Sequence, residues 1–400
     1  MGSDALVIGG GPSGLLVAKE IASRGFTVKI LEEHAQVGIP CHCAGLISLE
    51  GLKRIGVQAS NDFVQNEVNG GRIYSPDGQC IEIRDTRPRA HVVDRAALDQ
   101  HLANSALDSG ADLVLGRRVK RLTLSNGSVT GVSGNGFEEE ARLVIDAEGP
   151  SRRLATDAGL TKPKRMPFLG VNTEVIVETD PMMVEVWFGE ETAPGFYAWV
   201  IPITDALARV GLATKKDDPS GLLTRFIKKR FGIFTHPPPR AGQVLVDGPI
   251  EKTSSPGILL VGDAAGHVKP TTGGGIVLGG LCALEAGKVA AQALEDGDAT
   301  GRFLTQYDET WRRLYGSEFS RMQTLRDLAD RISDERMNRL FSTFNKAGLG
   351  EIVLSLVADG DIDLQGGTIM RALSEPRLMK VAIRGLGRLA LAELRSLVNL

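Results

Sequence analysis

The sequence is poor in cysteine, in aromatic side chains and in excess charge of either sign. Its 400 residues include four cysteines and 5% aromatics, and the formal net charge is −3. Four scattered cysteines are too few for a disulfide scaffold, so a reducing, cytoplasmic location is expected. A net charge this small gives no long-range attraction for nucleic acid, and we expect no nucleic-acid partner.

Long apolar runs are also missing. No run reaches the roughly 18 residues that cross a bilayer, so no membrane-spanning helix is expected. The chain opens with "MGSDALVIGGGPSG", which enters a strand and a glycine turn at once, and we expect no signal peptide. A hydrophobic content of 42% is typical of a globular protein, and the length predicts two or three packed units.

The chain changes pattern several times along its length. Residues 4–33 have the pattern of a βαβ unit: a buried strand "ALVIG", a helix that ends at Gly25, and a second strand "TVKILEE". Strands dominate residues 168–250, and helices dominate from about residue 276 onward. We therefore predict an α/β protein (α+β overall) with a discontinuous, Rossmann-like nucleotide-binding domain, an inserted strand-rich substrate domain and a helical C-terminal region. The nucleotide-binding domain is predicted to comprise residues 1–65, 86–162 and 251–300. The substrate domain is predicted to comprise residues 66–85 and 163–250, and the C-terminal region residues 301–400.

Gly9, Gly11 and Gly14 form a GxGxxG motif between the first strand and the first helix. Such glycines allow a tight turn, close approach of the backbone to a pyrophosphate, and close packing of helix on strand. Glu32 ends the second strand, where a carboxylate can accept both ribose hydroxyls of an adenosine. The neighbouring Glu33 would repel a 2′-phosphate, which argues against NADP at this site.

Two later stretches resemble motifs of flavoprotein hydroxylases and their relatives. "LVIDAEGPSRR" (143–153) is similar to their mid-chain motif, with Glu148 where aspartate is usual. "ILLVGDAAGHVKPTTGGGI" (258–276) is similar to their Gly-Asp motif. The resemblance implies that the cofactor is FAD, that Asp263 binds the ribityl chain, and that residues 270–276 contact the isoalloxazine ring.

Two short stretches narrow the resemblance to one family. "IPCHCAGLIS" has Cys43 at the position of the cysteine in a Pro-x-x-Cys-x-Gly loop, and "APGFYAWVIP" (193–202) is similar to a Tyr-x-Trp-x-Phe-Pro element, with Ile201 in place of phenylalanine. Over residues 4–315 the chain resembles the archaeal geranylgeranyl reductase family, within the p-hydroxybenzoate-hydroxylase-like flavoproteins. Nothing specific is recognised beyond residue 315.

The resemblance implies an FAD-dependent reductase that saturates C=C bonds of geranylgeranyl chains in membrane lipids or prenyl diphosphates. Because no second GxGxxG motif follows a strand, an external donor would bind transiently, either NAD(P)H or a ferredoxin-type carrier. An arginine in "VVDRAALD" also matches one that these relatives use near the flavin. The residues implied to bind FAD are Gly9, Gly11, Ser13, Gly14, Glu32, Cys43, Ala44, Arg95, Val119, Asp263, Gly274, Gly275 and Ile276.

Strand alternation in "FYAWVIP" places Tyr197, Trp199 and Ile201 on one face. Tyr197 and Trp199 are candidate substrate-binding residues, because an aromatic face suits a hydrocarbon with one polar end. The alternative is that these aromatics belong to the core.

Cys41, His42 and Cys43 allow several interpretations. Adjacent residues converge poorly on a metal tetrahedron, and a Cys41–Cys43 disulfide would close a strained ring, so neither is expected. Cys43 is either a packed thiol or the catalytic group, supplying the proton that must accompany a hydride from reduced flavin N5.

Other functions remain open. An aromatic hydroxylase or halogenase of the same fold would bind a small acid through arginine, and residues 168–208 contain none. A non-catalytic prenyl-binding carrier need not keep the flavin motifs. The tail from residue 376 either lies on the membrane surface as a peripheral contact or packs on the protein as an amphipathic helix.

Overall fold

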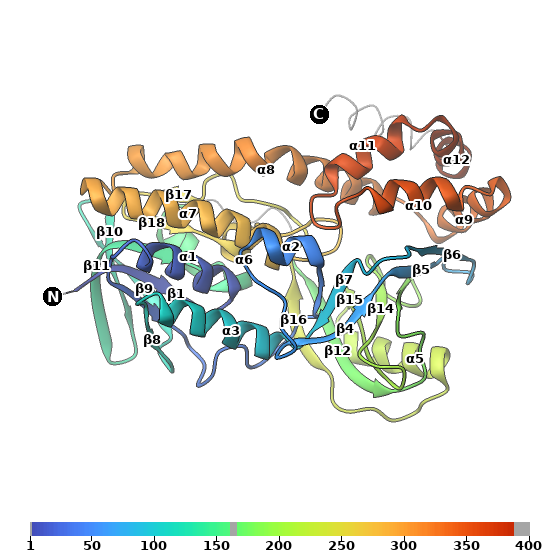
Figure 1. Ribbon diagram of the computed structural model, residues 1–400, viewed down its shortest axis with the longest axis horizontal. Helices are drawn as coiled ribbons and strands as arrows, with labels where there is room; N and C mark the ends of the chain where they lie inside the picture. Colours follow the sequence, from blue (N-terminus) through green and yellow to red (C-terminus); the bar gives the residue numbers. More distant parts are fainter. Residues whose placement is uncertain (1, 161–165, 388–400) are drawn as a thin grey trace.

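A largely parallel sheet lies at the centre of one half of the molecule (Figure 1). The computed structural model of the chain describes residues 2–160 and 166–387. The strand order is β17–β18–β11–β1–β2–β8, and β11 continues through β10 to β9. The strands are β1 (Ser3–Ile8), β2 (Val28–Leu31), β8 (Asp112–Val114), β9 (Val119–Ser125), β10 (Ser128–Gly134), β11 (Phe137–Asp146), β17 (Ser254–Ser255) and β18 (Ile258–Leu260).

Both faces of β1 are buried, which explains why its sequence is apolar throughout. Ala5 and Val7 pack in a core shared with the helices α1, α3, α7 and α8, whereas Leu6 and Ile8 pack in a second core with β9 and β10. A strand covered on both sides needs no polar alternation. These helices are α1 (Pro12–Ala22), α3 (Arg95–Asp108), α7 (Ile276–Asp296) and α8 (Gly301–Ala329).

A second, seven-stranded sheet has the order β16–β12–β15–β14–β13–β5–β6. Strand β5 pairs in parallel with β13 and antiparallel with β6, across a turn that contains Gly78 at φ +86°. The helix α5 (Pro219–Phe231) covers one face of this sheet. The strands are β5 (Gly70–Tyr74), β6 (Cys80–Arg84), β12 (Phe168–Ile176), β13 (Met183–Trp187), β14 (Ala198–Pro202), β15 (Leu207–Thr214) and β16 (Arg240–Val244).

Short elements lie between the two large sheets (Figure 1). A three-stranded sheet has the order β3–β7–β4, with β3 (Leu46–Ser48), β7 (Ala90–Val93) and β4 (Val64–Val68). The remaining short elements are α2 (Leu49–Arg54), η1 (Gly149–Ser151), α4 (Arg153–Asp157) and α6 (Gly262–Ala265). The predicted α/β class with an inserted strand-rich segment is confirmed; the exact domain boundaries stay a prediction.

The C-terminal part of the described chain is helical, and α8 runs from the first half of the molecule toward it (Figure 1). Its further helices are α9 (Asp334–Ala347), α10 (Gly350–Ala358), α11 (Gly366–Ser374) and α12 (Pro376–Leu386). Apolar residues of α12, including Leu386 and Met379, pack on α8, α9 and α11. Residues 388–400 of the predicted tail lie outside the described residues.

One described helix, α7, is long and apolar enough to cross a membrane. Within its most apolar window 67% of the residues are buried inside the protein, as in a core helix.

Candidate flavin site

The three motif glycines differ in what surrounds them. A Cβ on Gly9, which has φ +98°, would lie 2.4 Å from the carbonyl oxygen of Ala147, and a Cβ on Gly14 would lie 2.1 Å from the carbonyl oxygen of Gly9. A Cβ on Gly11 would meet no described atom within 4 Å. Gly9 and Gly14 therefore allow close packing, whereas Gly11 leaves open space at the N-terminus of α1, where a pyrophosphate would fit.

Ser13 brings the two glycine motifs together in space. Its Oγ lies 2.6 Å from the position of a Cβ on Gly262 and 2.9 Å from that on Gly279. The first turn of α1 thus packs directly against α6 and α7, and any larger residue at positions 262 or 279 would separate them.

Glu32 follows β2 and is almost fully buried, at 7% exposed. The backbone N–H of Gly10 donates to Oε2 at 2.7 Å, and the N–H of His34 donates to Oε1 at 2.9 Å. The N–H of Arg117 also donates to the carbonyl of Glu32 at 2.8 Å, which brings the segment leading to Val119 beside this carboxylate. The adenosine end of the predicted site is therefore built from residues that lie next to one another.

Glu33 is not an isolated charge. Its Oε2 lies 3.1 Å from Nε of Arg118, and both side chains are exposed. Arg118 offsets part of the repulsion that Glu33 would exert on a 2′-phosphate.

The cysteine loop is bound to the seven-stranded sheet. The amide of Asn172 in β12 donates to the carbonyl of His42 at 2.9 Å, and Nη1 of Arg209 in β15 donates to the carbonyl of Ala44 at 2.9 Å. Within the loop, the N–H of Gly45 donates to Sγ of Cys43 at 3.4 Å. These bonds place the Cys43 loop against β12 and β15 of the seven-stranded sheet.

Arg209 is a residue that the sequence analysis missed, one position beyond the stretch searched for arginine. It is buried, and its guanidinium also donates to the carbonyl of Val93 at 3.3 Å and to the side chains of Glu174 at 3.0 Å and Gln65 at 3.1 Å. Its Nη1 and Nη2 each make two hydrogen bonds within the fold, so neither nitrogen is free to bind an acidic substrate. An arginine within the apolar run "LARVGLAT" was the available signal.

Arg95, the first residue of α3, lies within electrostatic range of the two loop cysteines. Burial lowers its pKa, but the charges of Asp99, Cys43 and Cys41 outweigh burial and raise the pKa of Arg95 overall. Its Nη2 lies 3.0 Å from Oδ1 of Asp99, one helical turn later in α3. Burial raises the pKa of the Cys41 thiol. All four cysteines, each within the described residues, are free thiols.

Asp263 is aimed at the N-terminus of α7. Its Oδ1 would lie 2.7 Å from a Cβ on Gly275, the residue before Ile276 begins that helix. Burial raises the pKa of Asp263, while Arg152 and Arg95 act in the opposite direction. Within residues 2–160 and 166–387 no group donates a hydrogen bond to this carboxylate, which therefore fits the hydroxyls of a ribityl chain.

Arg152 holds the turn that carries Asp263, and it too was not predicted. It adopts a left-handed conformation at φ +48°, and its Nε donates to the carbonyl of Asp263 at 2.9 Å. Its Nη1 lies 2.7 Å from Oδ2 of Asp247, and both side chains are buried. In the same motif Glu148 accepts the N–H of Leu154 at 2.6 Å, so the glutamate caps the N-terminus of the short helix α4.

Tyr197 connects the aromatic stretch to the glycine-rich loop. Its hydroxyl donates to the carbonyl of Thr272 at 3.2 Å, and burial raises its pKa. Tyr197 precedes β14 and stacks on Phe196 with 4.3 Å between ring centroids, so the predicted alternation holds only from Ala198 onward. The two rings lie together because the chain has not yet entered the strand.

Trp199 lies on the same side as the cysteine loop. It packs in one cluster with Ala44 and Ile201, and its indole covers Gly211 on β15. Its Nε1 is buried and has no hydrogen-bond partner among the described residues. Trp199 therefore presents both an apolar surface and an unused donor.

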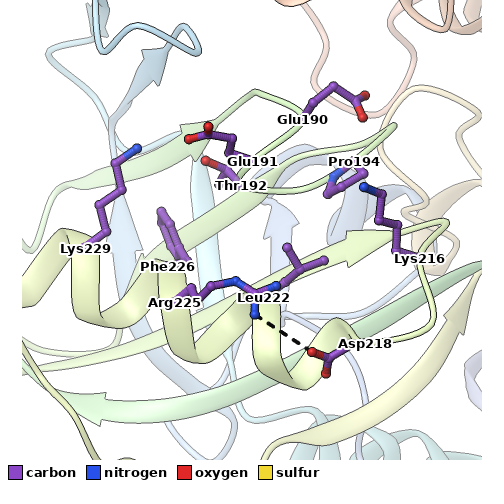
Figure 2. Close-up of a pocket in the computed structure, with 10 residues that line it drawn as sticks. All are labelled: Glu190, Glu191, Thr192, Pro194, Lys216, Asp218, Leu222, Arg225, Phe226 and Lys229. Atoms are coloured by element: carbon purple, nitrogen blue, oxygen red, sulfur yellow. Dashed lines mark ion pairs between the residues drawn. The ribbon is translucent and has the colours of Figure 1, made fainter.

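A groove of about 510 Å³ lies elsewhere, along α5 (Figure 2). Its lining mixes charges of both signs, including an ion pair of 3.9 Å between Arg225 and Asp218. None of the predicted site residues lines it. Among the described residues no group of three His, Cys, Asp or Glu side chains could hold a metal ion.

Known proteins are similar to this chain in sequence. The FAD binding domain family matches residues 2–229. A digeranylgeranylglycerophospholipid reductase 2 of Methanothermobacter thermautotrophicus is 36% identical over 361 residues, which cover 87% of this chain and 93% of the relative.

Solved structures are similar to this chain in fold. A geranylgeranyl bacteriochlorophyll reductase-like protein from Thermoplasma acidophilum has a TM-score of 0.83 at 25% identity, covering 99% of each chain. A myxobacterial chondrochloren halogenase has a TM-score of 0.65 at 20% identity over 96% of each chain, a likeness that shows the fold alone. The chain belongs to the digeranylgeranylglycerophospholipid reductase family of FAD-binding proteins.

Proposed function

We propose that the chain is an FAD-dependent reductase that saturates C=C bonds of geranylgeranyl chains in membrane lipids or prenyl diphosphates. The observation that carries the proposal is the unpartnered Asp263 carboxylate beside Gly275, in a family whose relatives are named for this reduction. A carrier without flavin would have no use for a half-buried carboxylate left free in this way.

Bound FAD, once reduced, would supply a hydride from N5 to one carbon of the double bond. We assign the donation of the accompanying proton to Sγ of Cys43. The proton would pass from Sγ to the other carbon of the double bond and leave a thiolate. Arg95 lies within electrostatic range of this thiol, and its guanidinium is buried. Solvent would then return the proton to Sγ.

The hydrocarbon chain is proposed to lie against Trp199 and Ala44, whose cluster is apolar. The unused indole Nε1 of Trp199 can bind the polar end of the substrate. Tyr197 contributes less directly, through its bond to the loop carbonyl of Thr272.

The remaining assignments are also proposals. FAD is proposed to bind within 1–65, 86–162 and 251–300, with the substrate on 66–85 and 163–250. Electrons are proposed to come from NAD(P)H or a ferredoxin-type carrier, in the cytoplasm at the membrane face. The packing of α12 on neighbouring helices favours a structural role for that part of the tail.

The test is anaerobic. Holoprotein reduced with dithionite is mixed with a geranylgeranyl lipid, and the mass of the product is measured by mass spectrometry. A gain of two hydrogens for each double bond supports the proposal. Oxygen consumption triggered by an aromatic acid, with no saturated lipid, would instead identify a hydroxylase or halogenase.

A further inference from the structure

A short segment of the C-terminal region crosses to the glycine-rich loop between β18 and α7. We define the strap as residues 361–366, which follow α10 and include the first residue of α11, and the flavin loop as residues 269–275. We infer that Lys269 is a positioning residue, and that its ion pair with Asp363 in the strap holds the flavin loop in the shape that binds FAD. The strap lies beyond residue 315, where the sequence resembles nothing specific.

The contact between strap and loop is buried. Nζ of Lys269 lies 2.8 Å from Oδ1 of Asp363, and Asp363 is only 4% exposed. The hydroxyl of Ser48, also buried, donates to the other oxygen of Asp363. Beside this pair, the hydroxyl of Thr271 donates to Oε1 of Gln365 at 2.7 Å. Two residues of the flavin loop, Lys269 and Thr271, are thus bonded to the strap.

The strap itself is fixed at both ends. Oδ1 of Asp361 accepts the N–H groups of Asp363 at 2.8 Å and Leu364 at 2.9 Å, and Asp361 is paired with Arg54 of α2. At the other end the N–H of Gly366 donates to Oε2 of Glu318 in α8 at 2.6 Å. A strap anchored to α2 and α8 can hold the loop in place.

Lys269 transmits this restraint to the glycines. Its N–H donates to the carbonyl of Gly274 at 2.9 Å, and its carbonyl accepts the N–H of Gly273 at 2.8 Å. A Cβ on Gly274 would lie 2.8 Å from Cε of Lys269, so the lysine stem packs under that glycine. Gly275 follows next and borders Asp263. Movement of Lys269 would therefore move the backbone that borders the ribityl-binding carboxylate.

Loss of one partner of a buried ion pair is costly for a protein. Removing one partner leaves an uncompensated charge, which costs much more than losing an exposed pair. The inference rests on the proposed placement of FAD against the flavin loop, but the pair can be tested without any lipid substrate.

The experiment compares four variants with the wild-type full-length protein: K269M, D363N, K269R and the double variant K269M/D363L. FAD affinity is measured by flavin fluorescence, and backbone amide exchange over residues 269–276 is measured in the protein without FAD. K288M is the matched control, because it makes the same Lys-to-Met change at an ion pair with Glu285 that touches neither the strap nor the flavin loop.

We expect K269M and D363N to weaken FAD binding about tenfold or more, with faster exchange in the flavin loop, and K269R to restore most of the affinity. K288M should bind FAD within about twofold of the wild type. If K269M fails to fold, the double variant decides, because it leaves no buried charge unpaired. Wild-type FAD affinity in a folded K269M or double variant would overturn the inference, whereas a wild-type protein that binds no FAD would overturn the proposed function.

Discussion

The two ends of the candidate FAD site are built differently. The adenosine and pyrophosphate end consists of Gly9 to Glu32 with one neighbouring segment, and its bonds join residues close in the sequence or in adjacent strands. The flavin-ring end is assembled from the cysteine loop, Arg95, Asp263 and the flavin loop, with Tyr197 and the strap packed around them. The first end can be recognised from a local motif, whereas the second depends on tertiary structure.

At neutral pH the largest effect on stability is expected at the first end, where two glycines should behave oppositely. In G14A the new Cβ would meet the carbonyl of Gly9 at 2.1 Å, so the free energy of unfolding should fall by about 3 kcal/mol. In G11A the new Cβ meets open space, so the apoprotein should keep its stability within about 0.5 kcal/mol. FAD affinity of G11A should nevertheless fall about tenfold or more.

Thermal unfolding of the apoproteins and FAD titration check this pair. G11A that lost as much stability as G14A, or that bound FAD normally, would contradict the assignment of Gly11 to the pyrophosphate.

At the second end, C43S should lower the rate of alkene reduction about 100-fold, because a hydroxyl is a far weaker acid than a thiol. FAD affinity should stay near that of the wild type. C41S is the matched control, two residues away in the same loop, and should keep most of the rate. Single-turnover kinetics of the reduced enzyme measure both; full turnover in C43S would remove the proton-donor role.

His267 links the flavin-ring end to α8 and predicts a pH dependence. It is fully buried against Trp311 and Phe319, and burial lowers its pKa from 6.5 to about 3, with Arg152 and Arg312 acting in the same direction. The unfolded chain therefore takes up a proton below pH 6.5 that the folded protein does not. The contribution to stability is complete above pH 6.5 and falls by about 1.4 kcal/mol per pH unit toward pH 3.

H267F removes this titration, so its stability should fall less than that of the wild type between about pH 7 and pH 4. Urea unfolding at several pH values measures the difference. Parallel curves for the two proteins would show that His267 does not contribute in this way.

The smallest effect is expected for Y197F. It removes one hydrogen bond to Thr272 and leaves a carbonyl without its partner, at a cost of about 1 kcal/mol, or about fivefold in FAD affinity. Y74F, in the same sheet but stacked on Trp187, is the control and should bind FAD normally. Equal FAD affinities for Y197F and Y74F would show that the Tyr197 hydroxyl does not support FAD binding by the flavin loop.

Sequence patterns predicted what is encoded locally. The GxGxxG turn, the helix that follows it and the buried strands on either side were predicted because each follows from the spacing of a few adjacent residues. Arg209 was missed because its partners come from four distant segments. The pairing of Lys269 with Asp363 has no local signal at all, since the two residues meet only after the C-terminal helices have packed.

The most direct test of the proposed reduction follows the flavin and the lipid in one experiment. Holoprotein is reduced without oxygen, mixed with a geranylgeranyl lipid, and followed by the visible absorbance of the flavin and by mass spectrometry of the lipid. We expect the flavin to be reoxidised and one double bond to be saturated for each flavin. Flavin that stays reduced, with the lipid unchanged, would contradict it.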